Sequence, residues 1–282
     1  MIIRPSFSGL YQAGLDLNAD AEAYINAVQA NDSFTFSKAQ KIAISDFFNA
    51  LVTAGIEDKI LKLHFYGANA AVGLRNAMSP DTVIASWTST PSASDFKDGY
   101  LEISGGGSGW LGSFNQNYTE IGLSPNDIGN FITVTGVPQA TSMYWMSAYN
   151  GTHNNLQLKQ DGGELAVRLS STVKKGQDEV GSAIDDPARN GVFIGSRTGY
   201  WSPNTITLNR TNTHGTLIKT HSAGGGAGVP PQDVGMLTAT TLVCNISLMG
   251  ITLGLTQVQA TALGNALFDC AIGLGHTAIG TT

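Results

Sequence analysis

The residues of this sequence that could bind a metal ion or catalyse a reaction are spread along the chain. The five histidines, His64, His153, His214, His221 and His276, are isolated from one another, and no HExxH zinc motif occurs. The sequence also lacks a P-loop and the GxSxG motif of a serine nucleophile. We therefore interpret each histidine as hydrogen-bonded within the fold or solvated, and we expect no metal site and no catalytic residue.

Pairs of carboxylates on one strand face are the arrangement that β-sandwich glucanases use, with one acid and one nucleophile. Such a pair needs a spacing of two residues, because successive side chains of a strand alternate between faces. Here Asp178 and Glu179 are adjacent, as are Asp185 and Asp186, so each pair would point to opposite sides. The sequence therefore does not favour glycoside hydrolysis by this route.

One motif matches a cofactor-binding pattern in spacing alone. Gly107, Gly109 and Gly112 have the GxGxxG spacing of dinucleotide-binding loops, which require a strand before the motif and a helix after it. The residues that follow, 113–119 and then Pro125, are not typical of a helix. We predict a loop between two strands and no bound cofactor.

Cys244 and Cys270 are the two cysteines, and each lies among apolar residues. This setting favours buried thiols that pack as small hydrophobic groups. A disulfide and a two-cysteine metal site remain as alternatives.

Aromatic residues give the remaining indication of binding. Tyr200 and Trp201 lie together in the loop 199–203, where exposed rings could stack on a sugar or contact a partner protein. The alternative is that they cover one end of the core. Trp87, Trp110 and Trp145 lie in or beside predicted strands, so we expect them in the core.

The elements that would position these residues begin with helices. Asn18 can cap a helix through Ala30, and a Ser37–Gln40 capping box begins a second helix that ends at Gly55. A short helical turn is expected over 57–63. A Thr256–Gln259 capping box begins a C-terminal helix that ends at Gly273 and Gly275. The buried residues expected in these helices are Tyr24, Ile25 and Val28 in the first, Ile44, Phe47, Phe48 and Leu51 in the second, and Val258, Ala262, Ala266, Leu267 and Cys270 in the last.

Between residues 64 and 250 the pattern changes to short apolar runs separated by turn residues, which is typical of an antiparallel sandwich. The clearest hairpin pairs Leu156 and Leu158 with 165–169 across the turn 161–163. Other strands are predicted at 83–87, 100–103, 131–134, 143–148, 192–196, 205–209, 217–220 and 242–249, with glycine-rich loops at 104–109 and 223–228. We expect two stacked sheets whose buried faces alternate with an uncharged exterior.

Composition limits the classes of partner. Charged residues make up 13% of the 282 residues and hydrophobic residues 42%, so uncharged polar groups must cover much of the surface. The net charge of −6 and the absence of a basic run argue against nucleic-acid binding. No apolar run has the length of a signal peptide or a membrane span, so we expect no membrane insertion. We divide the chain into an N-terminal anchor and helical segment, 1–63, and a sandwich with a closing helix, 64–282.

Several segments, in their order along the chain, resemble a family of concanavalin A-like and laminin-G-like domains found in structural proteins of tailed bacteriophages. They are a helical lead-in at 20–28 and 55–60, strand regions at 74–81, 87–88, 98–100 and 121–124, a central hairpin at 191–198 and 206–208, and a C-terminal signature at 254–257. The resemblance implies a mainly β jelly-roll sandwich with an N-terminal helical segment and a C-terminal helix. The calcium-binding Asp and Asn of plant lectins have no recognisable counterpart, so the resemblance implies neither a metal nor lectin activity.

Composition and resemblance together predict a non-catalytic structural protein of a phage virion, such as a tail-fibre, baseplate or capsid-decoration subunit, made in the host cytoplasm. Its partners would be other virion proteins and further copies of itself, a trimer by virion precedent, with residues 1–17 as an anchor. Two alternatives stay open. One is a carbohydrate-binding module that presents Tyr200 and Trp201 to a host-surface glycan, and the other is a glycan-degrading enzyme whose carboxylates come together from distant strands.

Overall fold

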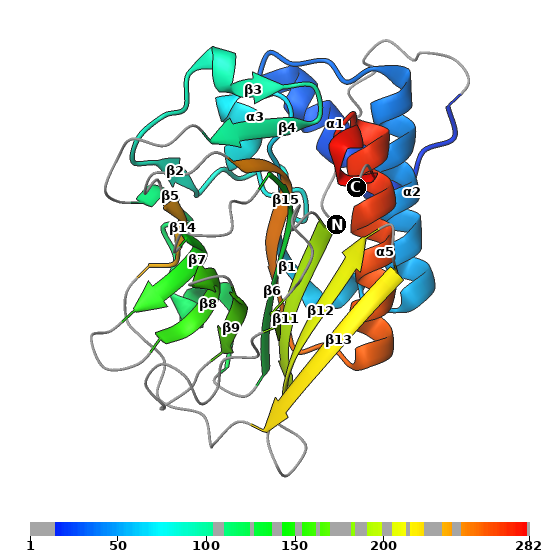
Figure 1. The fold of residues 1–282 in the computed structure, drawn as a ribbon. Coiled ribbons are helices and arrows are strands. Elements are labelled where there is room, and N and C mark those ends of the chain that lie inside the picture. Colours follow the sequence, from blue (N-terminus) through cyan, green and yellow to red (C-terminus); the bar gives the residue numbers. More distant parts are fainter. Residues whose placement is uncertain are drawn as a thin grey trace, which may run out of the picture.

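Two antiparallel β-sheets and three longer helices make up the computed structural model of the chain (Figure 1). It describes residues 15–103, 110–124, 127–136, 143–149, 154–161, 164–169, 182–183, 191–198, 205–212, 215–222, 233–238 and 244–280. The architecture confirms the predicted mainly β jelly-roll sandwich with an N-terminal helical segment and a C-terminal helix.

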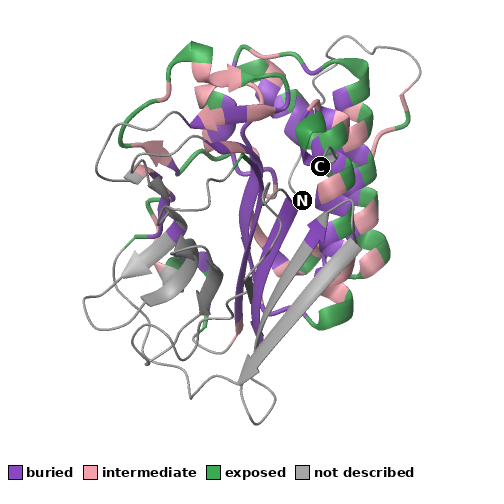
Figure 2. Cartoon of the chain, viewed as in Figure 1, coloured by how far each residue is buried: buried purple, intermediate pink, exposed green. Residues whose placement is uncertain are grey.

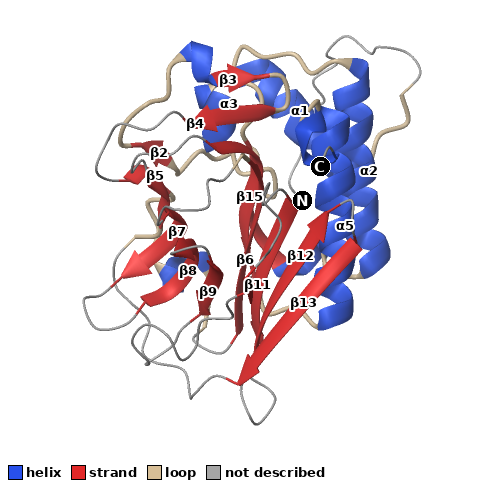
Figure 3. Cartoon of the chain, in the orientation of Figure 1, coloured by secondary structure: helices blue, strands red, loops and turns tan. Residues whose placement is uncertain are grey.

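The sheet that carries the helices is called the helix-side sheet, and it lies at the centre of the molecule (Figure 3). Its strand order is β13 (Gly215–Ser222), β12 (Thr205–Asn212), β11 (Gly191–Thr198), β6 (Asp127–Thr135), β15 (Cys244–Thr252), β4 (Tyr100–Ile103) and β3 (Phe96–Lys97). A further strand, β1 (Ile60–Phe65), pairs with the second half of β15, while β4 pairs with its first residues. One edge of β15 is thus shared by two strands.

The second sheet, called the outer sheet, packs against the other face. Its strand order is β10 (Ser182–Ala183), β9 (Glu164–Leu169), β8 (Asn154–Asp161), β7 (Met143–Tyr149), β14 (Gly235–Thr238), β5 (Trp110–Ser113) and β2 (Ser86–Trp87). The predicted hairpin is confirmed, because Leu156 pairs with Leu169 and Leu158 with Val167. Gly112 lies in β5, so the last glycine of the GxGxxG motif belongs to a strand and not to a helix.

The helix ends follow the local sequence signals. Asn18 caps α1 (Ala19–Asn31), and Ser37 begins α2 (Lys38–Ala54) through the predicted capping box. Gly55 ends α2 in the left-handed conformation, with φ of 62°. The predicted buried residues of both helices are buried. Short helical segments elsewhere are α3 (Ala70–Leu74), α4 (Tyr118–Ile121) and the 3-10 turns η1 (Glu57–Lys59), η2 (Ala93–Asp95) and η3 (Thr277–Gly280).

The buried stripe predicted for the C-terminal helix was wrong at its first two positions, since Val258 is exposed and Ala262 is only partly buried. α5 (Gln257–Leu274) begins with the Thr256 capping box and ends at Gly275, so Gly273 lies inside it. Val258 is 79% exposed, whereas Leu263 is fully buried. The buried face consists of Ala260, Leu263, Gly264, Ala266, Leu267, Cys270, Ala271 and Leu274. Polar Thr261, Asn265 and Asp269 recur four residues apart and mark the exposed side, and Val258 lies seven residues before Asn265, on that same side.

Two cores result, one on each face of the helix-side sheet (Figure 2). Ile132 and Phe193 pack between the sheets, whereas Phe131 and Ile194 pack against the helices. The alternation of a buried face with an exterior therefore does not apply to this sheet, because α5 and its neighbours cover the face that would otherwise meet water.

The helical turn predicted over 57–63 was too long. The turn ends at Lys59, and β1 begins at Ile60. Strands β3, β5, β10 and β14 were likewise not predicted, and each has only two to four residues.

Both cysteines are free and buried, which confirms the prediction of packed thiols. Burial raises the pKa of Cys244 to about 12 and raises that of Cys270 further, so neither thiol ionises readily. Trp87 is half-buried and packs against the inter-sheet core while its indole donates to the Ala70 carbonyl at 2.8 Å. No described helix combines the length and apolar character that crossing a bilayer requires.

Candidate functional site

A polar cleft lies beside β1, between the segment that follows α3 and the segment that follows β5. Its volume is about 280 Å³. We call it the β1 cleft. Its polar lining consists of Lys62, His64, Asn76, Ser79, Thr82 and Gln116, and its apolar lining of Leu74, Ile84, Ala85 and Phe114. Ser79, Thr82 and Ile84 are exposed, so the cleft opens to solvent.

The alternation of β1 places two polar side chains in this cleft. Leu63 and Phe65 belong to the core between the helix-side sheet and the helices. Lys62 and His64 have the opposite parity, so they point to the other face of the sheet. There they line the cleft together, two residues apart on one strand.

His64 lines the cleft and carries an unpaired, buried acceptor. The side chain is 1% exposed, and its Nδ1 lies 3.1 Å from the carbonyl oxygen of Gly73. Since a carbonyl only accepts, Nδ1 carries the proton and Nε2 holds a free lone pair. Nε2 is buried and has no hydrogen-bond partner among the described residues. Burial lowers the pKa of His64 to about 4, so the ring is neutral near pH 7.

Lys62 brings the positive charge of the cleft. Its ammonium group donates to the side-chain oxygen of Gln116, which is uncharged. Burial lowers the pKa of Lys62, because the ammonium is partly removed from water. No carboxylate occurs among the described residues that line the cleft.

The opposite wall is held in place by Asn76. Its Oδ1 accepts from the backbone N–H of Leu63 at 2.9 Å and of Met78 at 3.2 Å, and its Nδ2 donates to the Leu61 carbonyl at 3.2 Å. The Asn76 amide is therefore occupied in fixing the wall against β1, and it is not free for a ligand. Ile84 is 41% exposed on the same wall and offers an apolar surface to whatever enters.

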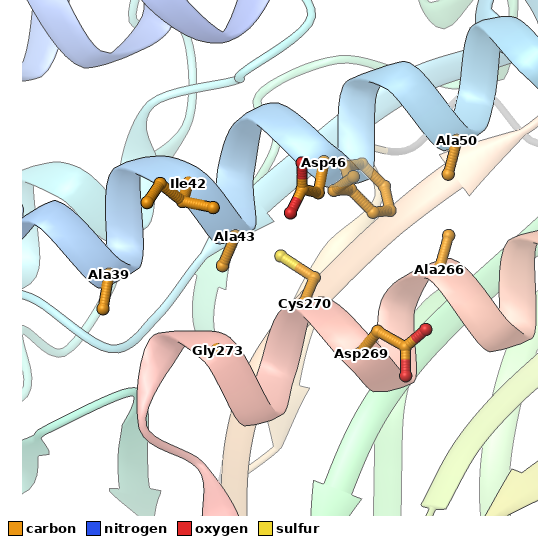
Figure 4. A pocket seen from close by; sticks show the side chains of 10 residues that line it. Ala39, Ile42, Ala43, Asp46, Ala50, Ala266, Asp269, Cys270 and Gly273 are labelled. Carbon is orange, nitrogen blue, oxygen red and sulfur yellow. The ribbon is translucent and has the colours of Figure 1, made fainter. Parts of the chain in front are cut away.

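A larger groove runs between α2 and α5 (Figure 4). Its volume is about 400 Å³, and four of its ten lining residues are alanines, three on α2 and one on α5. A Cβ added to Gly273 would lie 2.5 Å from the Cβ of Ala43, which shows how closely the helices approach. Its polar groups are Asp46 and Asp269 on opposite helices and the buried Cys270 thiol. With acceptors and no donor besides a buried thiol, this groove is poorly suited to orient a polar ligand.

The other predicted site residues have different outcomes. Tyr200 and Trp201 lie outside the described residues, as do the acidic pairs 178–179 and 185–186. His276 has both ring nitrogens hydrogen-bonded, to Thr135 Oγ1 at 2.9 Å and to Ser247 Oγ at 3.0 Å, as expected. No group of three metal-binding side chains occurs in the described part of the chain.

For His64 the expectation holds at one ring nitrogen only, since Nδ1 is hydrogen-bonded whereas Nε2 is neither hydrogen-bonded within the described fold nor solvated. A signal was available: in the run Ile60–Phe65, polar Lys62 and His64 alternate with apolar Leu61, Leu63 and Phe65. That period of two marks a strand with one polar face. Assigning the run to a helical turn concealed it.

No protein-family model matches the chain, and no curated protein matches it. Among solved structures it is similar to the binding domain of botulinum neurotoxin DC in complex with SialylT, with a TM-score of 0.48 and 9% identity over 75% of this chain and 52% of that one. It is also similar to the Trypanosoma rangeli sialidase, with a TM-score of 0.44 and 12% identity over 78% of this chain and 33% of that one. For the metal-free Emp46p carbohydrate recognition domain the TM-score is 0.33 and the identity 11%, over 61% and 88% of the two chains.

The chain thus spans about half the length of the toxin domain and a third of the sialidase. With TM-scores below 0.5, these likenesses assign neither a ligand nor a reaction to this chain. None of the three is a bacteriophage protein, so the resemblance to phage structural proteins stays a prediction.

Proposed function

We propose that this chain is a non-catalytic binding module that takes a sugar unit of a glycan into the β1 cleft. The observation that supports this is the cleft's unpaired acceptor, His64 Nε2, which is buried and oriented by Gly73. A buried polar group without a partner is costly, so a ligand hydroxyl that donates to it would restore a lost hydrogen bond.

The remaining lining suits the same ligand class. The Thr82 hydroxyl can donate and accept, and the Gln116 amide nitrogen can donate, while Ile84 offers an exposed apolar surface. Sugars combine hydroxyl groups with apolar C–H faces, and a cleft of about 280 Å³ is near the lower end of small-molecule pockets. One sugar unit therefore matches its size and polarity.

The non-catalytic part of the proposal rests on the carboxylates. Glycoside hydrolysis uses two of them, one on each side of the scissile bond. No carboxylate lines the β1 cleft among the described residues, and the aspartates of the helix groove stand among alkyl groups. The ligands of the structural neighbours are not carried over, because the identities are 9–12%.

The test is saturation-transfer NMR of the full chain with a panel of mono- and disaccharides. Thr82→Trp should fill the cleft and abolish the transfer, whereas Val83→Trp, at an exposed neighbouring position outside the lining, should leave it intact. Equal transfer in both variants would contradict the assignment of the cleft. Release of a free monosaccharide during the experiment would contradict the non-catalytic role.

We also propose that the chain is a virion subunit of a tailed phage, which associates with other virion proteins and with copies of itself. It is supported by the low charge of the chain and by the sequence resemblance. Labelling of intact particles with an antibody to the chain should mark one position on the virion, and sedimentation should give a trimer. Particles that never carry the label would refute the virion assignment, and a monomer at micromolar concentration would refute self-association.

A further inference from the structure

The charge balance of the β1 cleft points to the kind of sugar. Of the ten described residues that line it, Lys62 is the one with a charge, because His64 is neutral near pH 7. The ammonium contacts the neutral Gln116 side chain. A partly buried cation loses free energy of hydration, and without an anion beside it this loss is only partly offset. A ligand that brings one anionic group would supply the missing counter-charge.

The neighbouring histidine restricts the ligand further. Nδ1 donates to Gly73, so Nε2 can only accept in the neutral ring. A carboxylate has no proton to donate, so an anion alone would leave Nε2 unpaired. The ligand must therefore also carry a donor, and a hydroxyl group meets this need without a second charge.

The spacing on β1 connects the two requirements. Lys62 and His64 are two residues apart on one strand face, so their Cα atoms lie about 7 Å apart. One ligand can reach both when its carboxylate and a hydroxyl group stand on opposite parts of a small ring. A sugar acid has this arrangement, since its carboxylate and its ring hydroxyls are separated by several bonds.

We infer that the β1 cleft binds an acidic sugar, with Lys62 pairing with the ligand carboxylate and His64 Nε2 accepting from a ligand hydroxyl. This inference rests on the proposed function, because it names the ligand class of the same cleft. Gly73 fixes the His64 ring, and Asn76 holds the facing wall against β1. Because Nε2 is buried, a side chain at the mouth of the cleft must move aside to admit the ligand hydroxyl.

The experiment compares D-glucuronate with D-glucose, which differ in having a carboxylate or a hydroxymethyl group at one carbon. Affinities of the full chain for both are measured by NMR titration at pH 7. We expect glucuronate to bind about 10- to 100-fold more tightly, the range for a charge-assisted hydrogen bond. Lys62→Gln should remove this preference, so that the two sugars bind about equally, while Lys62→Arg should keep most of the preference.

Two further variants separate the roles. His64→Phe keeps an aromatic ring but removes the acceptor, so it should weaken both sugars by a similar factor. Lys59→Gln is the matched charge control, since the Lys59 ammonium donates to the Gly254 carbonyl and lies outside the cleft lining. Thermal unfolding of each variant shows whether it has folded.

The outcomes distinguish the two proposals. Equal binding of both sugars to the unmodified chain, abolished by Thr82→Trp, would overturn the acidic-sugar inference and leave the binding module standing. A preference for glucuronate that survives Lys62→Gln would also overturn it. Binding of neither sugar would overturn the inference and contradict the proposed function as well.

Discussion

The buried ion pair between Asp32 and Arg75 should dominate the stability of the N-terminal half. Asp32 is 7% exposed and Arg75 is 4% exposed, and the guanidinium makes two parallel contacts with the carboxylate, at 2.5 and 2.7 Å. The guanidinium also donates a hydrogen bond to the Pro80 carbonyl. The pair therefore joins the end of α1 to the segment that forms one wall of the β1 cleft.

Asp32→Asn tests this role with little change in shape. The hydrogen bonds that Arg75 donates to the Asp32 carboxylate raise the pKa of Arg75 above its ordinary value, and an arginine does not lose its proton in proteins in any case. The variant therefore leaves the buried guanidinium without its paired carboxylate. Removal of one partner of a buried pair costs about 3–5 kcal/mol, whereas an exposed pair contributes about 0.2–1 kcal/mol.

Urea unfolding at pH 7, followed by tryptophan fluorescence, measures the change. We expect Asp32→Asn to lower the free energy of unfolding by about 3–5 kcal/mol. The double variant Asp32→Asn with Arg75→Met should recover part of that loss, because no charge remains buried. Asp81→Asn is the matched control at an exposed acid near Arg75, and it should change stability by less than about 0.5 kcal/mol. A loss below about 1 kcal/mol in Asp32→Asn would refute the reasoning, since it would place the pair among exposed ones.

Three further predictions concern other parts of the fold. Burial lowers the pKa of His64 and His276 to about 4, while unfolded histidines titrate near 6.5, so the unfolded chain takes up protons first. The free energy of unfolding should therefore fall as the pH drops from about 6.5 towards 4, by up to about 1.4 kcal/mol per pH unit for each histidine. Urea titrations at pH 7, 6 and 5 measure this free energy, and an unchanged value would contradict the prediction. Val258→Glu, at the start of α5, should leave the stability unchanged or raise it by up to about 1 kcal/mol, whereas Leu263→Ala should lower it by about 2–5 kcal/mol. Calorimetry measures both stabilities, and a less stable Val258→Glu than Leu263→Ala would contradict the observed buried face. Asn130→Val should stabilise by about 1–3 kcal/mol, because the fully buried Asn130 amide has no hydrogen-bond partner among the described residues; a loss of stability on chemical unfolding would show that the amide is bonded after all.

Local chemistry was sufficient to determine several elements from the sequence alone. The capping boxes at Ser37 and Thr256 place helix starts because the side chain and the backbone donors that it satisfies lie within four residues. The β8–β9 hairpin is fixed in the same way, since a short turn sets the register of the strands beside it. The change from helical to alternating patterns likewise indicated the sandwich.

The tertiary structure decided the rest, because the deciding contacts join residues far apart in the chain. The partners of α5, which are α2, β11 and β12, are not encoded in its own period, although Asn265 and Asp269 mark the side that stays exposed. The helix-side sheet is buried on both faces only because α5 covers it, so its strands do not alternate with an exterior as an uncovered sheet would.

The β1 cleft shows the same division. The polar face of β1 is readable in Lys62 and His64, as residues two apart on one strand. That their side chains lie opposite Thr82 and Gln116, and that Nε2 of His64 is left without a partner in the described structure, follows from three chain segments meeting in space. Sequence determines which groups a strand presents, and packing determines what those groups face and whether water can reach them.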